Sequence, residues 1–176
     1  LDSTDELSAT QQQLIKNVFF QVVDAAAGYD LIQIFEVDPA RTSLLTPIFN
    51  FCKPTRSFAG SPVVERFRER RFKEDLQRVF DSVTFDRPTS PIINAIGSVA
   101  SLFPESSSSK HLIIASDFIE NSDLLNQYRS DWEGEAAARS KGINDSAPRL
   151  DGILVSMLFV PRPEVAHQNL QFRDWW

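Results

Sequence analysis

The sequence predicts an α/β protein, specifically a three-layer α/β/α sandwich that is doubly wound around a mostly parallel sheet with one antiparallel edge strand. Three observations lead to this fold class. Helical and strand-like patterns alternate along the chain, a short turn at residues 38–41 joins two strands into an antiparallel hairpin, and Asp2 and Asp117 stand where strands run into polar turns. The 176 residues, 42% of them hydrophobic, fit a single domain that buries a sizeable core.

The first half of the chain predicts two long helices and the hairpin. Apolar residues recur at helical spacing over residues 8–27, where Phe19 is expected in the core, and Gly28 ends the helix. Residues 31–37 and 44–51 have strand-like patterns, and residues 53–61 form a loop. Ser61 and Pro62 occupy the cap and the first position of a second helix that ends near residue 83.

The second half continues the alternation. A polar turn at residues 86–91 leads into a helix over residues 92–103, and residues 111–115 form a compact strand in which Ile114 is expected in the core. A short helix is predicted at residues 122–129, followed by a polar stretch, 130–149, that is mostly loop with a turn of helix near 135–139. Residues 152–160 form the last strand, and residues 163–176 form an amphipathic helix.

Composition restricts the classes of partner. A net charge of −6 argues against a nucleic-acid backbone, which requires a basic face. No apolar run is long enough for a membrane span. The single cysteine, Cys52, forms no internal disulfide, which favours the cytoplasm and also fits the periplasm.

Because the chain starts at Leu1 in what resembles the end of a strand, we expect the parent protein to continue in both directions.

Oxygen-bearing side chains gather in three turns. Residues 2–6, Asp-Ser-Thr-Asp-Glu, precede the first helix, Ser90 precedes the helix at residues 92–103, and Asp117 follows the strand at residues 111–115. In a doubly wound sheet these turns lie at one rim, where carboxylate and hydroxyl oxygens suit a hard cation such as Mg²⁺. The alternative is that Ser3 and its neighbours only cap the first helix.

These motifs resemble the von Willebrand factor type A domain family, a Rossmann-like fold, over essentially the whole chain. The family's metal-ion-dependent adhesion site has an Asp-x-Ser/Thr-x-Ser signature, to which Asp2, Thr4 and Glu6 correspond. Ser90, with Thr89 as the near alternative, is similar to the family's mid-chain Thr, and Asp117 is similar to its later strand-end Asp.

The resemblance implies a metal site for Mg²⁺ or Mn²⁺. In it Thr4 and Ser90 contact the cation, and Asp2 and Asp117 hold its bound waters. Glu6 stands where the family has a neutral Ser, and its added carboxylate would weaken the attraction of the cation for a partner's carboxylate. The residue after Asp117 is phenylalanine, where the family usually has glycine.

The resemblance also implies a non-enzymatic module that binds a protein partner, through an acidic side chain of that partner. A metal-dependent hydrolase and a metal-free scaffold of the same fold are the alternatives. An aspartyl-nucleophile phosphohydrolase needs a second Asp two residues after the first, where this chain has Thr4. The basic residues between positions 66 and 73 alternate with acidic ones and predict a solvated helix face, with docking of an acidic partner as the other interpretation.

Overall fold

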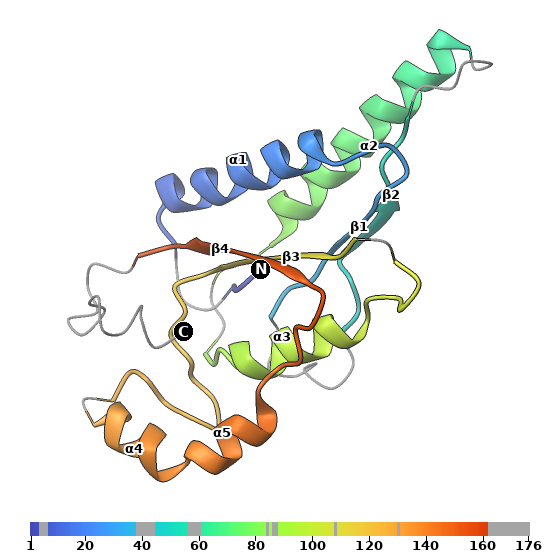
Figure 1. Ribbon diagram of the computed structural model, residues 1–176. Coiled ribbons are helices and arrows are strands. Elements are labelled where there is room, and N and C mark those ends of the chain that lie inside the picture. The colour runs from blue at the N-terminus through green and yellow to red at the C-terminus, as the bar shows by residue number, and fades with distance from the viewer. Residues whose placement is uncertain are drawn as a thin grey trace. The chain divides into compact units, whose positions relative to one another are not determined.

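The computed structural model describes residues 1–3, 7–37, 45–55, 61–83, 85, 88–107, 109–129 and 131–161. It confirms a mixed α/β protein with one antiparallel and one parallel pair of strands among these residues (Figure 1). The contacts divide the chain into two compact units, and each is described by itself. Unit 1 comprises the described parts of residues 1–6, 37–45 and 86–176, and unit 2 those of residues 7–36 and 46–85.

Unit 2 consists of α1 (Ala9–Ala25), β1 (Leu31–Ile34), β2 (Phe49–Cys52) and α2 (Pro62–Ser82). The hydroxyl of Ser8 accepts a hydrogen bond from the Gln11 backbone N–H at 3.3 Å, and the Gln11 side chain accepts one from the Ser8 N–H at 2.9 Å. This capping box fixes the start of α1. The strands pair antiparallel, as the sequence predicts, with Leu31 opposite Cys52.

The core of unit 2 lies between its two helices and one face of its sheet. It is formed by Val23 of α1, Ile34 of β1, Phe49 of β2, and Phe72 and Leu76 of α2. Phe19 packs only at the edge of this core, where it is half-buried and its ring lies 5.1 Å from that of Phe80. The prediction that Phe19 lies in the core is therefore confirmed only in part, because Val23 is the buried α1 residue of this cluster.

Unit 1 contains α3 (Ile92–Ser101), β3 (His111–Ser116), α4 (Trp132–Ala138), α5 (Ser140–Ser146) and β4 (Leu154–Phe159). β3 and β4 pair in parallel, with His111 opposite Leu154. α3 places Ile92 and Ile96 against Leu112 of β3, and the half-buried Ile114 joins this cluster. A second cluster joins Phe118, Ile119, Leu125, Trp132 and Ala136.

Two local predictions for unit 1 are wrong. Residues 122–129 form turns rather than a helix, because the Ser122 hydroxyl accepts from the Leu124 N–H at 3.2 Å and the Asn126 side chain from the Tyr128 N–H at 3.0 Å. Such local side-chain bonds compete with helical ones. Residues 132–146 form two short helices rather than mostly loop. The local sequence has weak helix propensity, and the burial of Trp132 stabilises the first of these helices through tertiary packing.

Some predictions fall on residues that the structure does not describe. The helix expected at residues 163–176 and the whole turn at residues 38–41 lie outside the described ranges. Among the helices that are described, none combines the length and the apolar character needed to cross a bilayer.

Candidate functional site

Leu1 and Asp2 lie alongside β3 in unit 1. The Asp2 backbone N–H donates to the Ala115 carbonyl at 2.9 Å, and the Leu1 carbonyl accepts from the Val37 N–H at 2.8 Å. Asp2 and Val37 thereby form a parallel bridge. These bonds place Asp2 at the carboxyl end of β3, the position at which open α/β sheets bind ligands.

The Asp2 carboxylate is the centre of a buried polar cluster. Its Oδ2 atom accepts hydrogen bonds from the Ser90 hydroxyl at 3.0 Å and from the Ser116 hydroxyl at 2.6 Å. Asp2 is 6% exposed, Ser90 1% and Ser116 3%, so little water competes for these bonds. The structure thus brings together two of the predicted site residues, Asp2 and Ser90, although 88 positions separate them in the sequence.

Asp117 begins the turn that follows β3. Its Oδ1 atom accepts from the Ile119 N–H at 2.9 Å, and the Ser116 hydroxyl accepts from the Phe118 N–H at 2.8 Å. Phe118 has a φ of 59°, in the left-handed region that favours glycine. The two side-chain bonds and the burial of the Phe118 ring hold this conformation. These contacts fix the position of Asp117. It directly follows Ser116, whose hydroxyl donates to the Asp2 carboxylate.

Glu120 is a buried acid that sequence reasoning missed. It is 0% exposed, and its Oε2 atom accepts from the Ile93 N–H, at the start of α3, at 3.0 Å. Burial raises the pKa of Glu120 to about 7, although hydrogen bonds from Ser122 and from the amides of Ile93 and Ile92 oppose the rise; the nearby charge of Asp2 adds to it. The available signal was an acidic residue directly after the apolar pair at positions 118–119.

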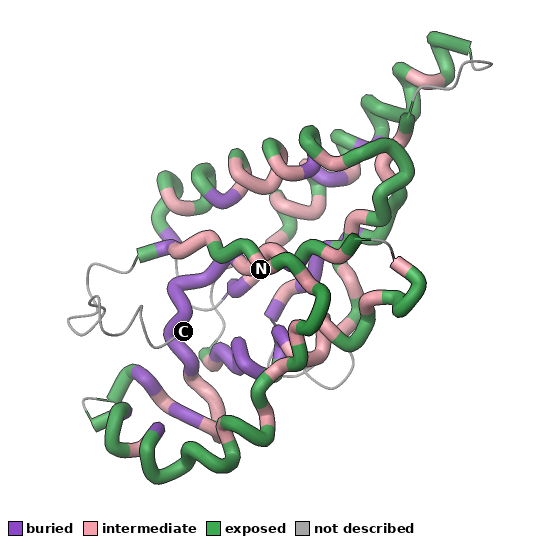
Figure 2. The backbone as a smooth tube through the Cα atoms, viewed as in Figure 1, coloured by how far each residue is buried: buried purple, intermediate pink, exposed green. Residues whose placement is uncertain are grey.

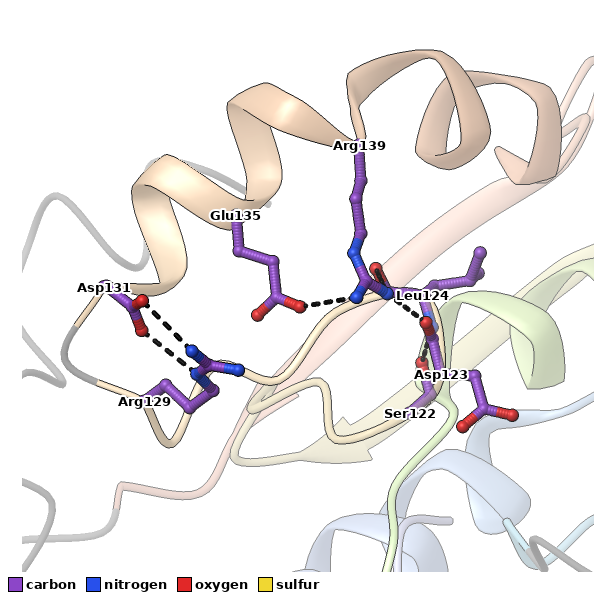
Figure 3. A network of polar contacts seen from close by, with 7 residues as sticks. All are labelled: Ser122, Asp123, Leu124, Arg129, Asp131, Glu135 and Arg139. Carbon is purple, nitrogen blue, oxygen red and sulfur yellow. Dashed lines mark hydrogen bonds and ion pairs between the residues drawn. The ribbon is translucent and has the colours of Figure 1, made fainter.

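The loop that carries Glu120 is fixed at both ends. Asn121 exchanges two backbone hydrogen bonds with Ser90, of 2.9 and 3.0 Å. Farther along, the Arg139 side chain pairs with Glu135 at 3.0 Å and donates to the backbone carbonyls of Asp123 and Leu124 (Figure 3). These bonds connect the loop to α4 and α5 and leave residues 115–120 as a continuous buried stretch (Figure 2).

The 3.0 Å between Ser90 Oγ and Asp2 Oδ2 is the length of their hydrogen bond, and the resemblance gives Asp2 contact with a cation only through water. Within the described ranges no group of three or more His, Cys, Asp and Glu side chains is arranged to hold a metal ion, so a cation here depends on hydroxyl ligands.

Two of the predicted metal-site residues, Thr4 and Glu6, lie outside the described residues. No family model, no curated protein and no solved structure matches this chain. The von Willebrand factor type A resemblance therefore depends on the chain's own residues alone.

Proposed function

We propose that this chain is a protein-interaction module of the von Willebrand factor type A kind, with its elements arranged as a three-layer sandwich and without enzymatic activity. The partner binds at a rim site formed by Asp2, Ser90 and Asp117, to which Thr4 and Glu6 contribute according to the sequence. The observation that carries this proposal is the convergence of Ser90 and Ser116 on one oxygen of Asp2.

A second observation supports the same proposal. The family usually has glycine directly after the strand-end Asp, and Phe118 adopts the backbone conformation for which glycine is the default residue. A phenylalanine in this conformation costs strain on the order of 1 kcal/mol or more. The local backbone therefore has a conformation that glycine adopts readily, although the residue here is phenylalanine.

The chemistry of such a site follows from its oxygens. Bound Mg²⁺ or Mn²⁺ would be held by the Ser90 hydroxyl directly and by Asp2 and Asp117 through water, as the resemblance implies. The Ser90 and Ser116 hydroxyls hold the Asp2 carboxylate in one orientation.

One observation favours a second candidate, a metal-free scaffold of the same fold. The Asp2 Oδ2 atom already accepts two hydrogen bonds and is almost fully shielded from solvent. A carboxylate satisfied in this way stabilises the fold without a metal. In that case the partner contacts the rim through hydrogen bonds and packing alone.

Isothermal titration calorimetry with MgCl₂ and MnCl₂ separates the two candidates. We expect saturable heat with the wild-type protein, and loss of that heat in Asp2→Asn and Asp117→Ala. Asp151→Asn removes an exposed carboxylate of unit 1 and serves as the matched control, which should bind like wild type. Circular dichroism verifies that each variant is folded. Binding heat that is unchanged in both Asp2→Asn and Asp117→Ala contradicts the cation site. Absence of binding heat with the wild-type protein also contradicts it and favours the metal-free scaffold.

A further inference from the structure

The amino-terminal half of α2 presents apolar side chains to solvent. Val63 is 68% exposed, Val64 47% and Phe67 51%. The buried side chains of α2, Phe72 and Leu76, come later and point elsewhere, since residues five positions apart lie about 140° apart around a helix. Figure 2 shows this half of α2 as mostly exposed. The three side chains therefore form an apolar ridge that nothing in the described part of unit 2 covers.

The same half of α2 is basic in an acidic protein. Residues 62–73 contain five basic and two acidic residues, whereas the whole chain has a net charge of −6. Lys73 pairs with Asp24 at 3.1 Å and Arg70 with Glu74 at 3.6 Å, in exposed pairs that water and salt weaken. The Arg70 guanidinium also lies over the Phe67 ring, 5.7 Å from its centroid. Positive charge and the Phe67 ring are thus adjacent on α2.

A hollow of about 470 Å³ lies between α1 and α2, with Arg66 and Arg70 of the same half of α2 in its lining. Phe20 of α1 contributes an apolar wall, and Arg66, Arg70 and Lys73 of α2 line the other side together with Glu69 and Glu74. The three basic residues follow one another at about one turn of helix, ~5–6 Å along the axis. Carboxylates on one face of a second helix have the same spacing.

We propose that the hollow and the ridge bind an acidic amphipathic helix of a partner protein. Carboxylates one turn apart on that helix pair with Arg66 and Arg70, one of its apolar side chains contacts Phe20 in the hollow, and another contacts Phe67 on the ridge. This is helix-in-groove recognition, in which apolar anchors supply affinity and charges supply orientation. An anionic membrane offers the same charge but is flat, so it leaves the hollow unfilled. The surface belongs to unit 2, whereas the Asp2 cluster belongs to unit 1.

Fluorescence anisotropy with a dye-labelled synthetic helical peptide, in which Glu one turn apart flank Leu residues, tests this proposal. We expect saturable binding to the wild-type protein, and affinity lower by about tenfold or more in the double variant Arg66→Glu/Arg70→Glu, because two attractions become repulsions. Phe67→Ala should also weaken binding. Arg68→Glu is the matched control: it makes the same charge reversal at an exposed position of α2 that does not line the hollow, and it should bind within about threefold of wild type.

Three results would overturn the proposal. The first is no binding of the peptide to the wild-type protein. The second is equal binding of a scrambled peptide of the same composition, or an equal loss in Arg68→Glu, either of which indicates attraction by net charge alone. The third is a result in which the wild-type protein sediments with phosphatidylcholine–phosphatidylserine vesicles, and Arg66→Glu/Arg70→Glu abolishes this sedimentation but binds the peptide as tightly as wild type. That result identifies a lipid surface as the partner instead.

Discussion

Phe49→Ala is expected to lower the free energy of unfolding by roughly 3–5 kcal/mol, the usual range for removing a buried aromatic ring. Phe49 is 2% exposed, and its ring lies 5.4 Å from that of Phe72 in an edge-to-face contact. It also packs with Ile34 and Leu76, so its removal leaves a cavity where α2 meets the sheet. Urea denaturation followed by circular dichroism measures the loss.

Phe51→Ala is the matched control, on the same strand and the same face of the sheet. Phe51 is 51% exposed and contacts the edge of Phe49, at a ring distance of 5.0 Å. We expect it to cost about 1 kcal/mol, since half-exposed rings bury less surface. Equal losses for the two variants would contradict the placement of Phe49 at the centre of the core of unit 2.

Glu120 should make the protein less stable as pH rises from 4.5 to 7. The carboxyl titrates near 4.5 in the unfolded chain and near 7 in the folded protein. Between these values the folded state binds more protons, so the free energy of unfolding falls as pH rises. The full difference corresponds to about 3 kcal/mol, present below the lower value and lost above the higher one.

Glu120→Gln keeps an oxygen to accept from the Ile93 N–H and cannot ionise, so it should flatten the pH dependence and make the protein more stable than wild type at pH 7. Glu133→Gln changes an exposed glutamate of α4 and should keep the wild-type slope. Denaturation at a series of pH values in metal-free buffer gives both slopes. If the free energy of unfolding of Glu120→Gln depends on pH as steeply as that of wild type, the group responsible for the pH dependence is not Glu120.

Local sequence signals predicted much of the fold. The helical pattern from residue 8 and the Ser61–Pro62 pair predicted the starts of α1 and α2, which begin at Ala9 and Pro62. The cap of α1 itself is Ser8, not Ser3 or its neighbours. The apolar run at residues 111–115 corresponds to β3 almost residue for residue. These features succeed because their causes, an apolar period and a proline at the first helical position, lie within a few positions of the chain.

Other features depend on distant contacts. Asp2 and Ser90 were predicted to share a rim because both precede helices in an α/β order, and their hydrogen bond agrees with that. The role of Ser116 was not visible in the sequence, since it requires the first residues to lie beside β3. Glu120 was missed for the same reason: its burial is created by a loop that returns to Ser90, not by its own neighbours.

A cation site at Asp2, Ser90 and Asp117 is tested most directly by NMR of ¹⁵N-labelled protein during a titration with MgCl₂. We predict saturable shifts for the amide signals of Ser90, Phe118 and Ile119, whose N–H groups lie next to the site oxygens or donate to them, with unchanged signals for Ile34 and Phe49 in unit 2. Asp2→Asn should abolish the shifts. Signals of Ser90, Phe118 and Ile119 that do not move, or shifts of the same size throughout the protein, would contradict the site.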